Sequence, residues 1–215
     1  MRLCMFHPVD HPLERGWVGR VDGDRVIQLA AQTLQSFFTG GGSAREHAEY
    51  PLAEVVFLAP VLHPPSIRLF DEQASFAFAN PAAVVGPGAS IRAPDDARPQ
   101  GDLTVRSRVA CVIGAEGAIG GFTGLAEWRA PGLRAPKDRD FALGLGPVVV
   151  TPDEFADASG FEWPAATALA AAGTTLFAGD VLAAPSLDAG NGVNAGETVA
   201  LEIEGIGTLE QRVAC

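Results

Sequence analysis

The sequence predicts a mostly β fold of the α+β class, and three observations carry this prediction. Short apolar runs with alternating polarity recur along the chain, which is typical of strands. Glycine and proline are abundant, with 25 and 16 among 215 residues, and favour many turns over long helices. Hydrophobic residues make up 47% of the chain, enough for one substantial core with a small appended lobe.

The N-terminal part, residues 1–62, is expected to form the small lobe. Its predicted elements are strands at 1–6, 17–21, 25–29 and 55–59, the last one buried, and a short helix at 30–38. Asp22-Gly23-Asp24 is the expected turn of a hairpin. Pro64 and Pro65 mark the boundary to a second domain, residues 65–215.

The second domain begins with turns and then contains a long alternating strand. Over residues 103–113, apolar side chains alternate with Arg106 and Arg108. Residues two apart on a strand share a face, so the two guanidinium groups are expected side by side. Cys111 lies on the opposite, apolar face, where a free cysteine behaves as a small buried hydrophobe.

Two helices and more strands are expected toward the C-terminus. Thr151 would be the N-cap of one helix, with Pro152 at its first position and Glu154 following. The second helix would span 165–172 and end at Gly173. Further strands are predicted at 147–150 and 198–204.

Charge and composition exclude several function classes. The net charge is -11 with a pI near 4.7, so phosphate backbones would repel the chain and nucleic acid is not an expected partner. No apolar run reaches membrane-spanning length and the N-terminus lacks a signal-peptide pattern, so no membrane partner is expected. Three scattered cysteines are typical of reduced thiols, and the expected location is cytoplasmic.

The order of several short motifs resembles the fumarylacetoacetate hydrolase (FAH) family. The clearest is the run 135–142, in which Lys137 and Asp140 match the family's lysine motif, followed by Gly146-Pro147 and the run 150–155. Other matching runs are 64–68, 79–83, 86–88, 112–114, 121–123, 179–181 and 205–209. The resemblance covers 65–215. It implies an FAH-type mixed β-sheet roll with a few short helices, a small N-terminal lobe and a homodimer.

The resemblance also implies a metal site, which this sequence does not retain. Catalytic members hold Mg²⁺ or Mn²⁺ on three carboxylates, and the metal stabilises an enolate during C–C cleavage, decarboxylation or tautomerisation. Arg106 and Arg108 stand at the first two carboxylate positions and Glu127 at the third, preceded by Ala126 where the family has Asn. One carboxylate beside two cations predicts no bound metal, so no cofactor is expected although the family uses Mg²⁺ or Mn²⁺.

Other active-site features of the family are also missing. Its His-bearing loop should lie between Phe70 and Ala79, where this chain has no histidine and therefore no general base. The stretch from Trp128 to Pro136 is shortened. The sequence is therefore identified as a shortened family member with a degenerate metal site.

Three interpretations are open for Arg106 and Arg108. They could be solvated, they could pair with Glu127 and fill the former metal site, or they could bind a substrate carboxylate or enolate in place of the metal. Lys137 could be a surface lysine or a catalytic one. The candidate catalytic residues are Lys137 and Glu127, and the candidate substrate-binding residues are Arg106 and Arg108.

Two functions follow from these interpretations, and whether the chain is an enzyme is left open. The first is a non-catalytic or binding homologue, with a small carboxylic acid as a candidate ligand. The alternative is a metal-independent lyase, isomerase or hydrolase that acts on a small 2-keto or 1,3-dicarbonyl acid through Arg106, Arg108 and Lys137.

Overall fold

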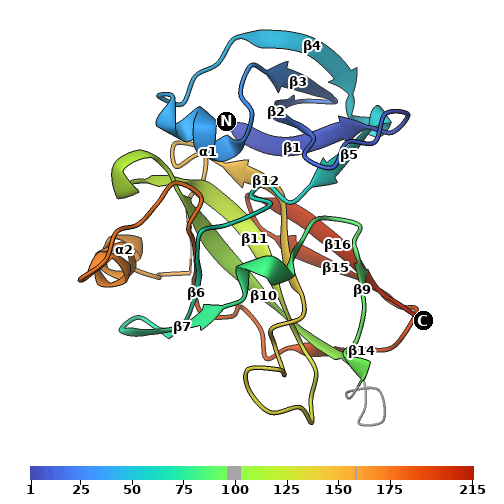
Figure 1. Cartoon of the computed structure of the whole chain (residues 1–215), viewed down its shortest axis with the longest axis vertical. Coiled ribbons are helices and arrows are strands. Elements are labelled where there is room, and N and C mark those ends of the chain that lie inside the picture. Colours follow the sequence, from blue (N-terminus) through green and yellow to red (C-terminus); the bar gives the residue numbers. More distant parts are fainter. Residues whose placement is uncertain (96–102, 158) are drawn as a thin grey trace.

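The computed structural model describes residues 1–95, 103–157 and 159–215. Among these residues there are two sheets, one of thirteen strands and one of three, with two α-helices on their surface (Figure 1). The main order of the large sheet is β4-β3-β2-β1-β12-β11-β10-β13-β6-β7, and that of the small sheet is β15-β16-β9. The predicted mostly β architecture with a few short helices is confirmed.

The chain runs through the lobe first and then through the roll. The lobe contains β1 (Arg2–Pro8), β2 (Trp17–Asp22), β3 (Arg25–Leu29), α1 (Leu34–Thr39), β4 (Glu46–Pro51), η1 (Leu52–Glu54) and β5 (Val55–Leu58). The first half of the roll contains β6 (Ile67–Glu72), β7 (Ser75–Ala79), η2 (Pro81–Ala83), β8 (Val84–Val85), β9 (Ser90–Ile91), β10 (Leu103–Ile113), η4 (Ala115–Gly117), β11 (Ile119–Arg129) and β12 (Leu143–Val150). The second half contains α2 (Trp163–Ala171), β13 (Val181–Ala183), β14 (Asn191–Val193), β15 (Thr198–Ile203) and β16 (Gly207–Val213).

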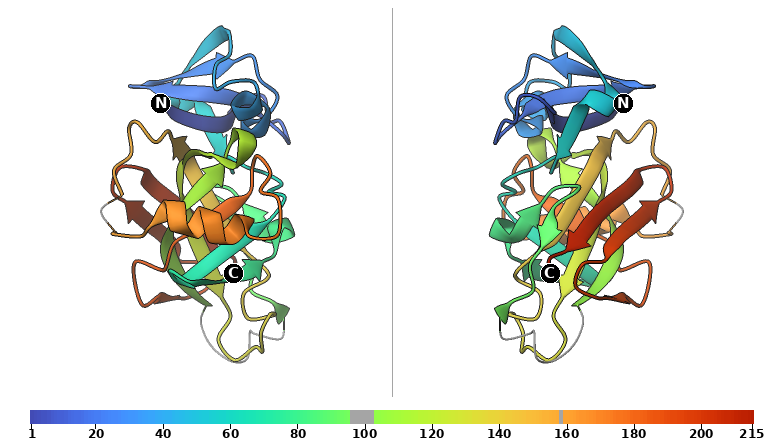
Figure 2. Two further views of the ribbon diagram at one scale, coloured as in Figure 1. Left: turned by 90° about the vertical axis from the view of Figure 1, so that its left-hand side faces the viewer. Right: turned by 90° about the vertical axis from the view of Figure 1, so that its right-hand side faces the viewer.

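The lobe is joined to the roll by backbone pairing. In Figure 2 the lobe lies at one end of the molecule, above the strands of the roll. Its strand β1 pairs antiparallel with β12, with Arg2 opposite Val150 and Leu3 opposite Val149. One hydrophobic cluster contains Leu3 from the lobe and Val112 from β10. The large sheet therefore continues from the lobe into the roll, and the division near residues 62–65 stays a prediction.

A second hydrophobic cluster lies under α2, on the face of the sheet that carries Cys111. Trp163 and Ala166 of α2 pack there with Phe70 of β6 and Phe122 of β11. Cys111 is fully buried, as predicted, and burial raises the pKa of its thiol to about 12. This packing leaves the other face of β10 to the arginines.

Two elements differ from the sequence prediction for local reasons. The helix of the lobe begins only at Leu34, because Thr33 and Ser36 form a capping box, while Ala30 pairs with Arg45 through a 2.8 Å backbone hydrogen bond. The strand expected to be buried at 55–59 is β5, and it is largely half-buried instead.

The predicted helix at Thr151 was wrong, since these residues form a turn. The Thr151 hydroxyl accepts a hydrogen bond from the terminal amine of Met1 and donates one to the Met1 carbonyl at 3.2 Å. Glu154 forms an ion pair with the same amine at 2.9 Å. Both side chains of the expected capping box therefore contact the N-terminal residue Met1, and they do not cap a helix.

Candidate functional site

The site predicted from the sequence lies on the antiparallel pair β10–β11. Glu127 stands directly opposite Arg106, and Arg108 lies two residues further along the same face. The Arg108 Nε and Nη2 atoms lie 2.8 and 2.7 Å from Glu127 Oε2. Arg108 is 1% exposed and Glu127 0% exposed. Of the three interpretations of the arginines, the structure shows the pairing with Glu127, and the partner is Arg108.

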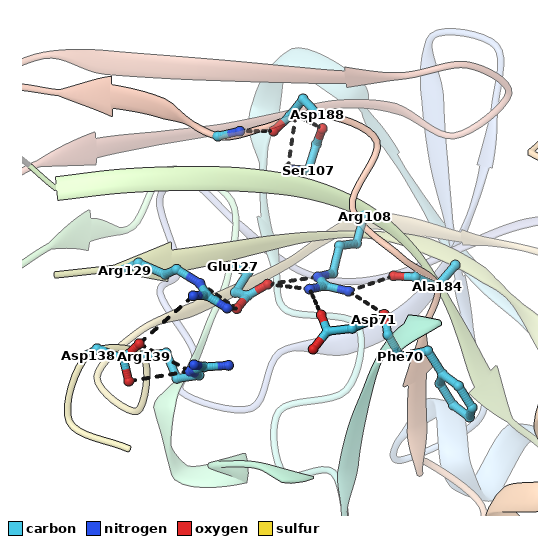
Figure 3. Close-up of polar contacts among 11 residues, drawn as sticks. Phe70, Asp71, Ser107, Arg108, Glu127, Arg129, Asp138, Arg139, Ala184 and Asp188 are labelled. Carbon is cyan, nitrogen blue, oxygen red and sulfur yellow. Dashed lines mark hydrogen bonds and ion pairs between the residues drawn. The ribbon is translucent and has the colours of Figure 1, made fainter. Parts of the chain in front are cut away.

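The Arg108 guanidinium group is saturated with acceptors (Figure 3). Its Nη1 atom donates to the carbonyls of Phe70 and Ala184 at 2.7 and 2.9 Å, and Nη2 also donates to Asp71 at 3.1 Å. A guanidinium group has five N–H donors. Because Nε and Nη2 also contact Glu127, each of the five faces a protein acceptor.

Irregularities in the neighbouring strands supply these acceptors. The register of β6 and β7 shifts between Phe70 and Glu72, which places Asp71 in a β-bulge, a feature that re-aims side chains. On the other side, β13 pairs with β10 only as far as Ala183. The next residue, Ala184, donates its N–H to the Val109 carbonyl at 2.9 Å, and the Ala184 carbonyl accepts a hydrogen bond from Arg108.

Glu127 is held on its second oxygen by another arginine. The Arg129 Nε and Nη2 atoms lie 2.9 and 2.8 Å from Glu127 Oε1, and Arg129 Nη1 lies 3.9 Å from Asp138. Figure 3 shows these side chains as a row of alternating charge from Asp71 to Asp138. We call the five residues Asp71, Arg108, Glu127, Arg129 and Asp138 the saturated centre.

Sequence reasoning missed three members of the saturated centre. A signal for Arg129 was available, because it lies two residues after Glu127 on a strand and so shares its face. Asp71 and Asp138 come from a bulge and from the loop before β12, and no periodicity predicts their direction. Their positions depend on tertiary packing.

Arg106 differs from Arg108 although both occupy the same face of β10. It is half-buried and lies against Gly190, where an added Cβ atom would come within 3.0 Å of Arg106 Cγ. No hydrogen bond or ion pair of its guanidinium group is found among the described residues. Arg106 therefore differs from Arg108, whose five N–H groups all face protein acceptors.

Lys137 lies outside the saturated centre. Its Nζ atom forms an ion pair with Asp140 at 2.8 Å, and its side chain is 76% exposed. No hydrogen bond or ion pair in the described part of the chain joins it to Arg106, Arg108 or Glu127. Its loop is attached to β11 through a 2.8 Å hydrogen bond from the Ala130 N–H to the Asp138 carbonyl.

The region of the family's histidine loop is a tight hairpin. β6 ends at Glu72 and β7 begins at Ser75, so two residues connect them. The four histidines of the chain are His7, His11, His47 and His63, all before this hairpin. A histidine from the β6–β7 connection is therefore not part of the site.

The side chains of the saturated centre do not fit Mg²⁺ or Mn²⁺. These ions require several free oxygen ligands, whereas each Glu127 oxygen contacts two arginine nitrogens. Within the described residues, no cluster of three or more His, Cys, Asp or Glu side chains could hold a metal ion. The expectation that this site binds no metal stays a prediction.

Comparisons with known proteins identify the fold. The chain is similar to the crystal structure of maleylpyruvate hydrolase from Sphingobium sp. SYK-6, with 21% identity, a TM-score of 0.83 and coverage of 100% of this chain and 99% of the other. It is also similar to 5-carboxymethyl-2-hydroxymuconate delta-isomerase from Mycobacterium smegmatis, with 22% identity, a TM-score of 0.77 and the same coverage. No family model and no curated protein matches the sequence.

Two of the similar structures were determined with both a metal ion and a small organic compound. One is the same hydrolase in complex with manganese(II) and pyruvate, at 20% identity and a TM-score of 0.81. The other is 2-keto-3-deoxy-D-arabinonate dehydratase complexed with magnesium and 2,5-dioxopentanoate, at 16% identity and a TM-score of 0.79. Each covers 100% of this chain and 99% of its own. The predicted FAH-type fold is confirmed, and these identities establish the fold alone.

Proposed function

We propose that this chain is a metal-free binding protein built on the FAH-type fold. The observation that carries the proposal is the saturation of Arg108, whose five N–H groups all face protein acceptors. A buried guanidinium group with no free donor stabilises the fold and has none left for a substrate. Glu127 is likewise engaged on both oxygens, so neither residue is poised for catalysis.

The proposed ligand is a small carboxylic acid. Similar structures were determined with pyruvate and with 2,5-dioxopentanoate, which are acids or carbonyl compounds of this size. The Arg106 guanidinium group supports an anionic ligand, because it has no acceptor among the described residues. We further propose that the protein acts as a homodimer in the cytoplasm. No helix in the described part of the chain is long and apolar enough to cross a membrane.

Calorimetric titration with Mn²⁺ and Mg²⁺, paired with assays on oxaloacetate and acylpyruvates, tests the metal-free proposal. We expect no metal binding and no turnover with or without either ion. One Mn²⁺ bound per chain, together with Mn²⁺-dependent turnover that Glu127→Gln abolishes, would contradict it. Light scattering at micromolar concentration tests the homodimer, and a monomeric mass would contradict that part.

The alternative function is a metal-independent lyase, isomerase or hydrolase of a small 2-keto or 1,3-dicarbonyl acid. The open Arg106 favours it, since a cation beside an enolate could stabilise developing negative charge. Lys137 would have to leave Asp140 to take part. Turnover of an acylpyruvate in the presence of excess EDTA, lost in Arg106→Gln and Lys137→Met, would support this alternative over the binding proposal.

A further inference from the structure

A cavity lies in the lobe, beside the segment that leads to the roll. Its volume is about 220 Å³, and Met5, Pro60 and Leu62 provide apolar wall while Arg15, His63 and Gln35 provide polar groups. We call this cavity the lobe pocket. Ligand sites are typically apolar hollows with a few convergent polar groups.

Rigid elements form the walls of the lobe pocket. Met5 lies in the middle of β1 and is 2% exposed, and Pro60 is buried just after β5. Gln35 belongs to the first turn of α1 and packs so closely on Gly179 that a Cβ atom there would lie 2.6 Å from its Cγ. The pocket therefore needs little reorganisation to accept a ligand, which lowers the entropic cost of binding.

The backbone beside Arg15 is also fixed. Gly16 has a φ of +64°, and a Cβ atom there would lie 2.5 Å from the Phe6 carbonyl oxygen. This close approach against β1 requires glycine and holds the start of β2 at the pocket. The exposed Arg15 side chain is thereby anchored at one end while its guanidinium group stays free to meet a ligand.

The charge of the lobe pocket is opposite to that of the whole protein. None of the described residues that line it is acidic, although the chain has 26 acidic and 15 basic residues. Within the described residues, the side chains of Arg15 and His63 make no hydrogen bond or ion pair. A planar guanidinium group without a partner matches the two oxygens of a carboxylate.

We infer that the lobe pocket binds a small monocarboxylic acid with an apolar body, its carboxylate on Arg15 and His63 and its body against Met5, Pro60 and Leu62. The inference rests on the proposed binding of small carboxylic acids and adds a site for that ligand class apart from Arg106. The pocket is separate from the saturated centre, so the two claims are tested by different titrations.

Titration of the full-length ¹⁵N-labelled protein with benzoate tests this inference. We expect a Kd of about 1 mM or tighter, which is reasonable for a ligand of this size. Amide signals of Gln35 and Leu62 should shift, and benzamide, which has the same shape without the charge, should bind at least about tenfold more weakly. Absence of binding, equal affinity for benzamide, or shifts elsewhere only would overturn the inference.

A matched pair of variants distinguishes benzoate binding at the lobe pocket from a general effect of the protein's charge. Arg15→Gln should weaken benzoate binding by roughly ten- to hundredfold, the loss expected for a charged hydrogen bond. Arg45→Gln removes the same charge from an exposed lobe residue that does not line the cavity and should leave the affinity unchanged. Leu62→Trp should block binding by filling the cavity, with the thermal midpoint reporting that each variant folds. Equal weakening by both arginine variants would overturn the inference.

The Mn²⁺ titration keeps the outcomes distinguishable. Benzoate binding to the lobe pocket with no Mn²⁺ binding supports both claims. Mn²⁺ binding at Glu127 together with benzoate binding would overturn the metal-free proposal and leave the lobe pocket standing. Absence of both Mn²⁺ binding and benzoate binding would overturn only the inference about the lobe pocket.

Discussion

The saturated centre and the lobe pocket both contain arginine, but the two arginines have opposite surroundings. Arg108 is buried, and every N–H group of its guanidinium faces a protein acceptor. Arg15 is exposed beside apolar wall, and its guanidinium has no acceptor in the described part of the chain. Arginine alone therefore does not indicate a ligand site. The number of donors left without a protein partner separates a structural arginine from a binding one.

The largest effect is expected when the saturated centre loses its central carboxylate. Glu127→Ala removes the buried carboxylate between Arg108 and Arg129 and leaves each with only its outer aspartate, so the free energy of unfolding should fall by roughly 3–5 kcal/mol. Urea denaturation measures this change. Glu202→Ala, which removes an exposed glutamate of β15, is the control and should change stability by less than about 0.5 kcal/mol. A loss below about 1 kcal/mol for Glu127→Ala would mean that water reaches the centre.

A smaller loss is expected from the outer arginine of the same centre. Arg129→Met leaves Glu127 Oε1 without its two nitrogen contacts and removes the 3.9 Å ion pair with Asp138, and should cost about 1–3 kcal/mol. Hydrogen exchange of the Asp138 loop should also become faster, because one of its anchors is lost. The control is Arg134→Met, an exposed arginine in the same loop. Equal effects of Arg129→Met and Arg134→Met would argue against a role of the saturated centre in holding the Asp138 loop.

Lys137 lies outside the saturated centre, and its substitution provides a stability change to compare with that of Glu127→Ala. Its ion pair with Asp140 is exposed, so Lys137→Met should lower stability by no more than about 1 kcal/mol. Thermal denaturation in low and high salt measures this, and salt should reduce the difference between wild type and variant. A cost comparable to that of Glu127→Ala would show that the lysine belongs to the buried network.

The smallest effect on stability is expected in the lobe pocket. Arg15→Gln should change the free energy of unfolding by less than about 0.5 kcal/mol, since it removes no protein contact. The same variant should lose benzoate affinity. Arg15 is therefore expected to affect ligand binding without affecting stability, whereas Arg108 and Glu127 are expected to affect stability. A destabilised Arg15→Gln would indicate that the arginine has a structural role.

Much of this fold is predictable from the sequence because strand periodicity is local. The alternation around Arg106 and Arg108 predicts β10 within one residue, and the Asp22-Gly23-Asp24 turn predicts the hairpin of β2 and β3. The expected helix at Thr151 failed because its capping groups meet Met1 at the other end of the sequence. A local motif cannot indicate a long-range competitor for its own hydrogen bonds.

The site was only partly predictable for the same reason. The pairing of Glu127 with an arginine follows from charge accounting on adjacent strands, but Arg106 and Arg108 look equivalent in the sequence. They differ because the bulge at Asp71 and the end of β13 bring acceptors to Arg108 alone. The lobe pocket had no sequence signal, since its walls come from four separate segments of the lobe and linker.

A crystal structure of the protein grown with MnCl₂, with data collected at the manganese absorption edge, tests the central claim most directly. That claim is that arginine contacts have replaced the metal at Glu127. We predict no anomalous peak within about 2.0–2.6 Å of either Glu127 oxygen, the coordination range of such hard cations. Arg108 should remain on Oε2 and Arg129 on Oε1. A manganese peak at Glu127 with Arg108 displaced would contradict the account.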